Sequence, residues 1–135
     1  MVPSDRTRPA RAADAPLYFG KAVEFLEAAE AALRDELWDA AGLAAIHAGI
    51  SAGDAVLAYR GGVRSAGQDH RSAVDLLLQV LGPAATDASR HLKRLVDKKN
   101  LVEYEQRRLT QPEALDLAEH ARRFLRWART QLPAR

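Results

Sequence analysis

A run of small residues between Trp38 and Arg60 constrains this chain more than any other feature. Nearly half of its positions are alanine or glycine, so a helix formed here has little side-chain bulk. Glycine costs about 1 kcal/mol relative to alanine inside a helix. That cost is offset where neighbouring helices pack closely against the backbone. The run therefore predicts a central helix that other helices surround.

Three polar residues interrupt this apolar run at helical spacing. His47, Ser51 and Asp54 lie at positions i, i+4 and i+7, which places them along one side of a helix. A polar stripe on a central helix is either an internal hydrogen-bond network or the wall of a groove. The sequence leaves both interpretations open, and it makes these three residues candidates for ligand binding.

The rest of the chain predicts four more helices with short connections. Apolar residues recur at helical spacing from Asp14 to about Leu33, from Gln68 to Leu81, and from Asp87 to Val102. A last helix begins at the capping box Thr110–Glu113 and runs to about residue 132. No alternating strand pattern of useful length is present. We expect an all-α, up-and-down bundle of about five helices.

Composition favours one soluble domain. The chain has 135 residues, 47% of them hydrophobic, and no cysteine. Residues 1–13 are rich in proline and arginine without periodicity and are expected to be a disordered tail, followed by a single helical domain over residues 14–135. Neither a secretory signal nor a membrane-spanning segment is expected, so we expect a cytoplasmic protein.

Charge is unevenly distributed along the chain. Residues 13–60 carry a net charge of −5, whereas residues 90–135 carry +6. Arg122, Arg126 and Arg129 lie at i, i+4 and i+7 on the last predicted helix and could follow a nucleic-acid backbone. The other interpretation is that these three arginines lie on a solvated helix face. Pairing between the acidic first half and the basic last part of the chain would also explain why the charges are divided along the sequence.

Lys99 continues the apolar stripe of the fourth predicted helix, so its aliphatic stem must lie against protein. Glu103 follows four residues later and can pair with it. Asn100 and Tyr104 have the same spacing in this segment. The segment is either a helix-end ion pair or part of a ligand site.

The loop before the third predicted helix contains Arg64 and His70. Glycine just before a helix leaves backbone N–H groups that favour anions, although Asp69 competes for them as a cap. The segment is therefore either a capped loop in which His70 packs against the protein or an anion site. The four histidines give no convincing metal constellation, and no nucleotide-binding or nucleophile-elbow motif is present, so no cofactor is expected.

The order of these elements resembles the HEPN (higher eukaryotes and prokaryotes nucleotide-binding) domain family over residues 17–132. The segments that carry the resemblance are Ala44–Leu57 in the central helix, Gly62–Leu77, and Lys99–Tyr104 before the last helix. The resemblance implies an all-α bundle, usually a homodimer with a groove at its interface. It also implies either a metal-independent ribonuclease or toxin paired with a nucleotidyltransferase-like antitoxin, or an inactive module that binds RNA or nucleotide.

The family's ribonucleases carry an arginine followed, after four to six residues, by a histidine. In this chain Lys99 occupies the arginine place and Glu103 the histidine place. Lysine lacks the bidentate fork of arginine, and an ionised glutamate repels a phosphodiester. The sequence therefore favours a non-catalytic or degenerate HEPN-like binding protein that acts as a dimer, with a toxin–antitoxin, defence or stress-response system as its setting.

Two other hypotheses stay open. A ribonuclease using Arg64 and His70 is the second, and a helical protein–protein adaptor is the third. We expect the polar residues of the central helix to meet Arg64, His70 and Lys99 in a shared cleft.

Overall fold

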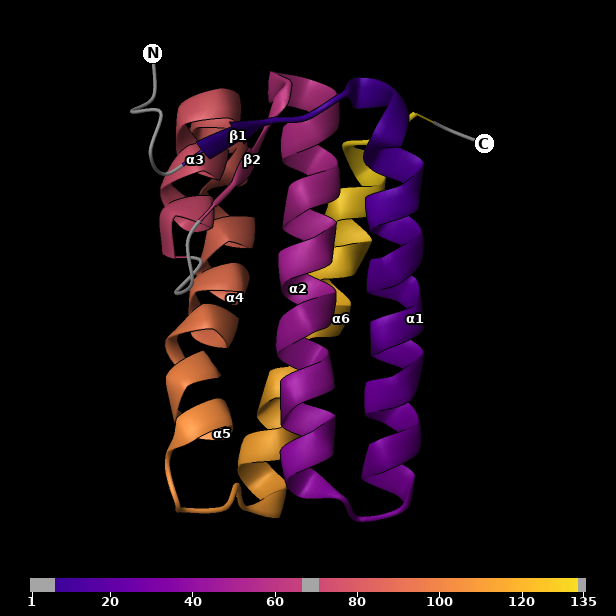
Figure 1. Ribbon diagram of the computed structural model, residues 1–135, viewed down its shortest axis with the longest axis vertical. Helices are drawn as coiled ribbons and strands as arrows, with labels where there is room; N and C mark the ends of the chain where they lie inside the picture. Colours follow the sequence, from indigo (N-terminus) through magenta and orange to yellow (C-terminus); the bar gives the residue numbers. More distant parts are fainter. Residues whose placement is uncertain (1–6, 67–70, 134–135) are drawn as a thin grey trace.

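A computed structural model describes residues 7–66 and 71–133, and within them the chain forms an up-and-down helical bundle (Figure 1). The long helices α1, α2 and α6 form three sides. The shorter helices α3, α4 and α5 follow one another down the fourth side (Figure 1). The bounds are α1 Ala15–Arg34, α2 Trp38–Gly61, α3 Arg71–Leu81, α4 Thr86–Asp97, α5 Lys99–Tyr104 and α6 Gln111–Thr130. The predicted all-α bundle is confirmed, with its fourth helix divided into α4 and α5 by a break at Lys98.

The central position of α2 is confirmed. This helix packs against α1, α3, α4, α5 and α6. Its small residues allow close approach: a Cβ atom added to Gly49 would lie 2.5 Å from Cδ1 of Leu95 in α4. Leu109 and Leu117 approach Gly42 in the same way. The glycines of α2 therefore make room for leucine side chains from α4, the loop before α6, and α6 itself.

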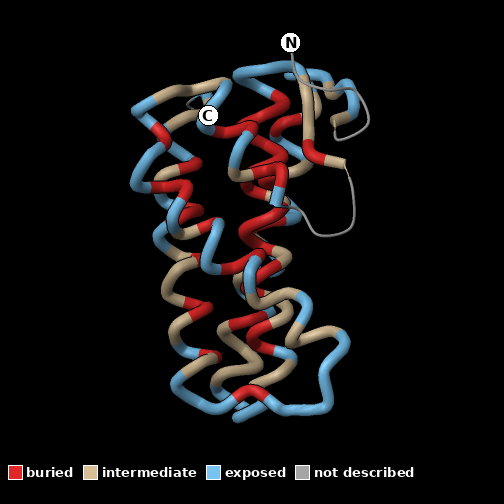
Figure 2. Tube along the Cα trace, turned by 90° about the vertical axis from the view of Figure 1, so that its left-hand side faces the viewer, coloured by how far each residue is buried: buried red, intermediate tan, exposed pale blue. Residues whose placement is uncertain are grey.

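The core lies along α2 and the inner faces of its neighbours (Figure 2). Phe124 of α6 and Ile46 and Leu57 of α2 are among the largest fully buried side chains. By length and composition α2 is also apolar enough to cross a membrane, although no membrane-spanning segment is expected from the sequence, and 72% of its most apolar stretch is buried inside the bundle. A core helix of a soluble domain passes the same test of composition.

Local signals explain where the helices begin and end. Gly62 has a φ of 66°, a left-handed conformation that favours glycine, and it ends α2 as predicted. Thr110 and Glu113 form the predicted capping box at the start of α6, with both reciprocal hydrogen bonds present. The short link between α1 and α2 includes Glu36 with a φ of 59°, and it makes the two helices antiparallel neighbours.

The prediction of a disordered tail over residues 1–13 is wrong for residues 7–13. Strand β1 (Thr7–Pro9) pairs antiparallel with β2 (Val63–Ser65), and Arg8 lies opposite Arg64. The backbone N–H of Ala10 donates to the carbonyl of Gly62, and a short 3-10 helix, η2 (Ala12–Asp14), leads into α1. A second short helix, η3 (Gly82–Ala85), joins α3 to α4. Strands this short leave no alternating hydrophobic pattern for sequence analysis to detect.

Candidate functional site

The polar stripe of α2 meets two different elements along its length. His47 and Asp54 are separated by about 10 Å along the helix axis, given a rise of about 1.5 Å per residue. The His47 side chain is 35% exposed and faces α5, whereas Asp54 is only 8% exposed and lies near β2. Ser51, between them, is half-buried. The stripe therefore contributes to two polar clusters rather than to one continuous site.

The first cluster joins α2 to α5. Nζ of Lys99 lies 2.6 Å from Oε1 of Glu103, and Nε2 of His47 lies 3.8 Å from the other carboxylate oxygen. The side chains of Lys99 and Glu103 are only 12% and 20% exposed. The predicted pairing of Lys99 with Glu103 is confirmed, and the expectation that the lysine stem lies against protein is confirmed with it.

His47 is held neutral more readily than a free histidine. Burial lowers its pKa, which the Glu103 carboxylate partly opposes and the Lys99 ammonium reinforces. The ring of Phe25 from α1 lies beside the imidazole, with 5.5 Å between centroids. Phe25 is 37% exposed, so this cluster combines a neutral imidazole, an internal ion pair and an accessible aromatic ring.

The second cluster joins α2 to β2. Burial raises the pKa of Asp54 to about 6, while the Arg64 guanidinium, the Ser65 backbone N–H and the Lys21 ammonium act in the opposite direction. The Ser65 hydroxyl forms a buried 2.8 Å hydrogen bond with the hydroxyl of Ser72 in α3. The strand pair therefore holds Arg64 and Ser65 against the buried carboxylate of α2.

The remaining predicted residues do not join these clusters. Asn100 and Tyr104 are on α5 and exposed, with Tyr104 at 73%. Arg64 faces Asp54. His70 lies outside the described residues, so the predicted pairing of Arg64 with His70 stays a prediction. His47 lies beside Lys99 and Glu103, whereas Arg64 lies near Asp54, and the convergence of all these polar residues on one cleft stays a prediction.

The predicted basic column on α6 is not a uniform solvated surface. Arg122 pairs with Glu119 at 2.8 Å and with Glu30 of α1 at 3.0 Å. The guanidinium of Arg129 lies 4.8 Å from the centroid of the Phe19 ring. Only Arg126 of the three is exposed without an interaction in the described part of the chain. The acidic first half and the basic last part of the chain thus neutralise each other partly within the fold.

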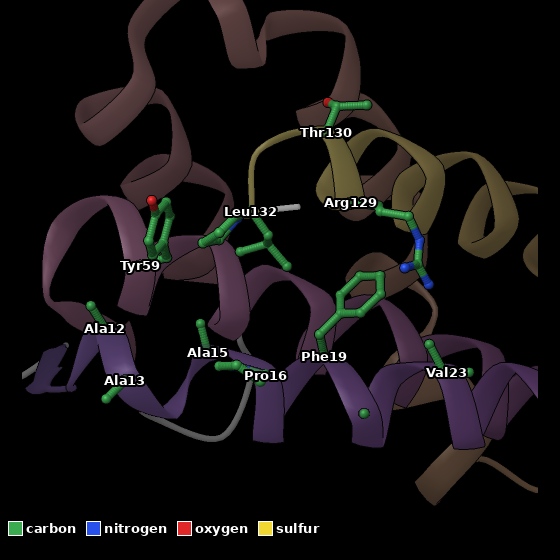
Figure 3. Close-up of a pocket in the computed structure, with 12 residues that line it drawn as sticks. Ala12, Ala13, Ala15, Pro16, Phe19, Val23, Tyr59, Arg129, Thr130 and Leu132 are labelled. Carbon is green, nitrogen blue, oxygen red and sulfur yellow. The ribbon is translucent and has the colours of Figure 1, made fainter. Parts of the chain in front are cut away.

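An apolar groove of about 1130 Å³ lies where the start of α1 meets the ends of α2 and α6. Phe19, Tyr59 and Leu132 are among its lining residues, and Arg129 borders it (Figure 3). The sequence does not reveal this groove because its walls come from three separate segments, namely residues 12–23, Tyr59 and residues 129–133. Helical periodicity places Phe19 inward but cannot place it beside a residue more than a hundred positions away.

Replacing Glu103 by glutamine is expected to destabilise the fold by about 1–3 kcal/mol, because the mostly buried Lys99 ammonium loses its carboxylate. The matched control is Asp97→Asn, which breaks the i,i+4 pair between Lys93 and Asp97. This pair has the same 2.6 Å contact, but its side chains are 64% and 39% exposed. That control should lose less than about 1 kcal/mol. Denaturant unfolding measures both. Equal losses would contradict the burial of the Lys99–Glu103 pair.

The same Glu103→Gln variant should lower the pKa of His47 further, since the Glu103 carboxylate raises it in the wild type. NMR titration of the His47 imidazole in the wild type and the variant measures this change in pKa. A rise in that pKa would contradict the contact between His47 and Glu103.

Comparisons with known proteins place this geometry in a family. The model of the HEPN domain matches residues 15–131. Among solved structures, the crystal structure of TT1696 from Thermus thermophilus aligns with a TM-score of 0.72 and 22% identity, covering 88% of this chain and 98% of that chain. At this identity the alignment shows a shared fold. No protein of curated function matches the sequence. Because the family model spans nearly all of the bundle, the chain belongs to the HEPN domain family.

Proposed function

We propose that this chain is a non-catalytic HEPN-domain binding protein that acts as a homodimer. The observation that supports this most is the Lys99–Glu103 ion pair, with its 2.6 Å contact and its small exposure. These two residues stand where the family resemblance puts the arginine and histidine of a ribonuclease. In this chain they neutralise each other.

The chemistry of the pair disfavours RNA cleavage. A carboxylate 2.6 Å from the lysine ammonium offsets the positive charge that would stabilise a phosphorane. The same carboxylate repels a phosphodiester. Three residues separate Lys99 from Glu103, one fewer than the shortest spacing of the ribonuclease motif. The imidazole of His47 lies beside this pair, but it faces Glu103 rather than a free cation.

A protein partner is favoured over a nucleic-acid backbone. Two of the three arginines predicted to contact phosphate are engaged, Arg122 with glutamates and Arg129 with Phe19. The face around His47 instead offers Phe25, and α5 offers the exposed Tyr104. Aromatic side chains with a polar neighbour are typical of protein interfaces. We therefore propose a second copy of the chain at this face, and a nucleotidyltransferase-like antitoxin as the further partner that the family resemblance suggests.

The ribonuclease hypothesis using Arg64 and His70 has less support. Arg64 lies beside the buried Asp54 and contributes to its electrostatic environment. An arginine in this position is partly neutralised before any substrate binds. The adaptor hypothesis remains compatible with the proposed protein partner. A measurement of RNA affinity distinguishes a protein that binds another protein from one that binds RNA.

Light scattering after size-exclusion chromatography should give a mass of about twice 14.8 kDa for the wild type. Phe25→Arg should produce monomers, because it places a charge beside His47. The matched control is Leu17→Arg, which alters a 68% exposed residue nearer the start of the same helix and should leave the dimer intact. A monomeric wild type would refute the proposed dimer.

Incubation of the protein with RNA in EDTA tests the absence of catalysis. We expect no cleavage above background from the wild type. Metal-independent cleavage that disappears in His70→Ala would refute the non-catalytic proposal and support the ribonuclease hypothesis. Binding to RNA that weakens steeply with salt would replace the protein partner with a nucleic acid.

A further inference from the structure

Two histidines from different helices meet between α4 and α6, away from the clusters on α2. Nδ1 of His91 in α4 lies 2.9 Å from Nδ1 of His120 in α6. The ring centroids are 5.1 Å apart and the ring planes differ by 47°. The side chain of His120 is 25% exposed, and His91 is also only partly buried. Both imidazole side chains are therefore partly accessible to solvent.

Asp116 lies beside this pair. It lies one turn before His120 on α6, with Oδ1 3.4 Å from Nε2 of that histidine. Its other oxygen accepts a hydrogen bond from Nε of Arg94 at 3.2 Å. A carboxylate beside Nε2 favours the proton on that nitrogen and leaves Nδ1 of His120 with a free lone pair. His91 then donates its Nδ1–H to His120.

We propose that His91 and His120 form a binding site for a divalent copper or nickel ion, with water completing the coordination. Imidazole nitrogens suit both ions, and both accept ligands at right angles. Two nitrogens at about 2.05 Å from one metal are about 2.9 Å apart at a right angle but about 3.3 Å apart at a tetrahedral angle. The observed separation of 2.9 Å is that of a hydrogen bond, and it leaves the two nitrogens at the distance that a right-angle arrangement needs. Asp116 supplies the carboxylate that metal-binding histidines commonly have at their other ring nitrogen.

Metal binding requires both imidazole rings to turn, because at a centroid separation of 5.1 Å and a contact of 2.9 Å the two nitrogens point almost directly at each other. The ring centroids would approach from 5.1 Å to about 4.5 Å when both nitrogens bind one ion at right angles. The proton on Nδ1 of His91 would move to its own Nε2 through solvent, so a neutral pair loses no net proton. In the part of the chain that the structure describes, no group of three or more histidine or acidic side chains could hold a metal. Water must therefore supply the other ligands.

The charged groups around the pair form ion pairs with one another, and Glu119 is shared by Arg122 and Arg123. Asp87, Asp116 and Glu119 are the carboxylates in this neighbourhood, from α4 and α6. Each arginine nearby is paired with one of them, in the pairs Arg90–Asp87, Arg94–Asp116 and Arg123–Glu119. The arriving ion therefore meets ion pairs and not a free cationic patch.

Titration of Cu²⁺ into the protein without a polyhistidine tag tests the site, with calorimetry for affinity and electron paramagnetic resonance for the ligands. We expect one site per chain with two nitrogen ligands. His91→Ala and His120→Ala should each weaken binding at least about tenfold, and Asp116→Asn about tenfold. The matched control is His47→Ala, which removes a partly exposed histidine outside the pair and should leave the affinity unchanged.

A second measurement does not depend on comparing the affinities of variants. Cu²⁺ should raise the thermal midpoint of the wild type, and EDTA should reverse the rise, because the ion binds the folded pair. The rise should be absent in His120→Gln, which keeps a polar side chain at this position. Unchanged affinity in either alanine variant, a spectrum without two nitrogen ligands, or an equal thermal shift in His120→Gln would each refute the site.

Discussion

Phe124→Ala is expected to lower the free energy of unfolding by about 3–5 kcal/mol, because it deletes a large aromatic side chain from the core. Phe124 is fully buried in α6 and is one of the largest such side chains. A Cβ atom added to Gly53 of α2 would lie 3.9 Å from its ring. The Trp127 ring also lies beside it, with 5.6 Å between centroids. The phenyl ring thus fills space that the slender central helix leaves open.

Thermal and denaturant unfolding measure this loss. We expect the thermal midpoint to fall by roughly 10–20 °C for a domain of this size. Phe124→Leu should cost less, since leucine keeps part of the buried volume. Leu115→Ala on the same helix is the matched control, because Leu115 is 45% exposed and its loss should be well below that of Phe124. A loss below about 1 kcal/mol at Phe124 would mean that α6 does not pack on α2 as described.

The helices of this bundle could be predicted from the sequence because each has a local signal. The alanine and glycine residues of α2 indicate a helix that is packed against its neighbours rather than exposed. Thr110 and Glu113 mark the start of α6 within four residues. The Lys99–Glu103 contact could be predicted for the same reason, since both partners lie one turn apart on α5. These interactions depend on spacing along a single helix.

The other parts of the candidate sites depend on distant segments. Arg122 pairs with Glu30, which is 92 residues away, and this contact removes an arginine from the predicted basic column. His91 meets His120 across 29 residues, so neither shows a metal-ligand spacing in the sequence. Arg64 faces Asp54 at the position where β2 pairs with β1, and three-residue strands carry no detectable pattern. Helical periodicity shows which face is buried but not which other element covers it.

Asp54→Asn is expected to change how stability depends on pH, because the wild-type carboxyl has its pKa raised to about 6 by burial. Its ordinary value is 3.8. In the range between these two values the folded protein binds a proton that the unfolded chain has released. Stability therefore falls as the pH rises from about 4 to about 6, and it levels off above that range.

The expected size follows from about 1.4 kcal/mol per pKa unit, which gives a loss of about 3 kcal/mol over the whole range. Other carboxylates also titrate there, so the informative quantity is the difference between variant and wild type. Asparagine keeps the shape of the side chain and does not titrate. The free energy of unfolding of Asp54→Asn, relative to the wild type, should rise by about 3 kcal/mol between about pH 4 and pH 7.

Denaturant titrations at closely spaced pH values across this range measure the difference. Ser51→Ala is the control, because it alters the same side of α2 without removing a titrating group. In Arg64→Met the transition should move to higher pH, since the Arg64 guanidinium opposes the rise in the pKa of Asp54. A difference between Asp54→Asn and the wild type that does not vary with pH would show that Asp54 is hydrated. In that case β1 and β2 would not seal this end of α2 from water, and the electrostatic role given to Arg64 would fail with it.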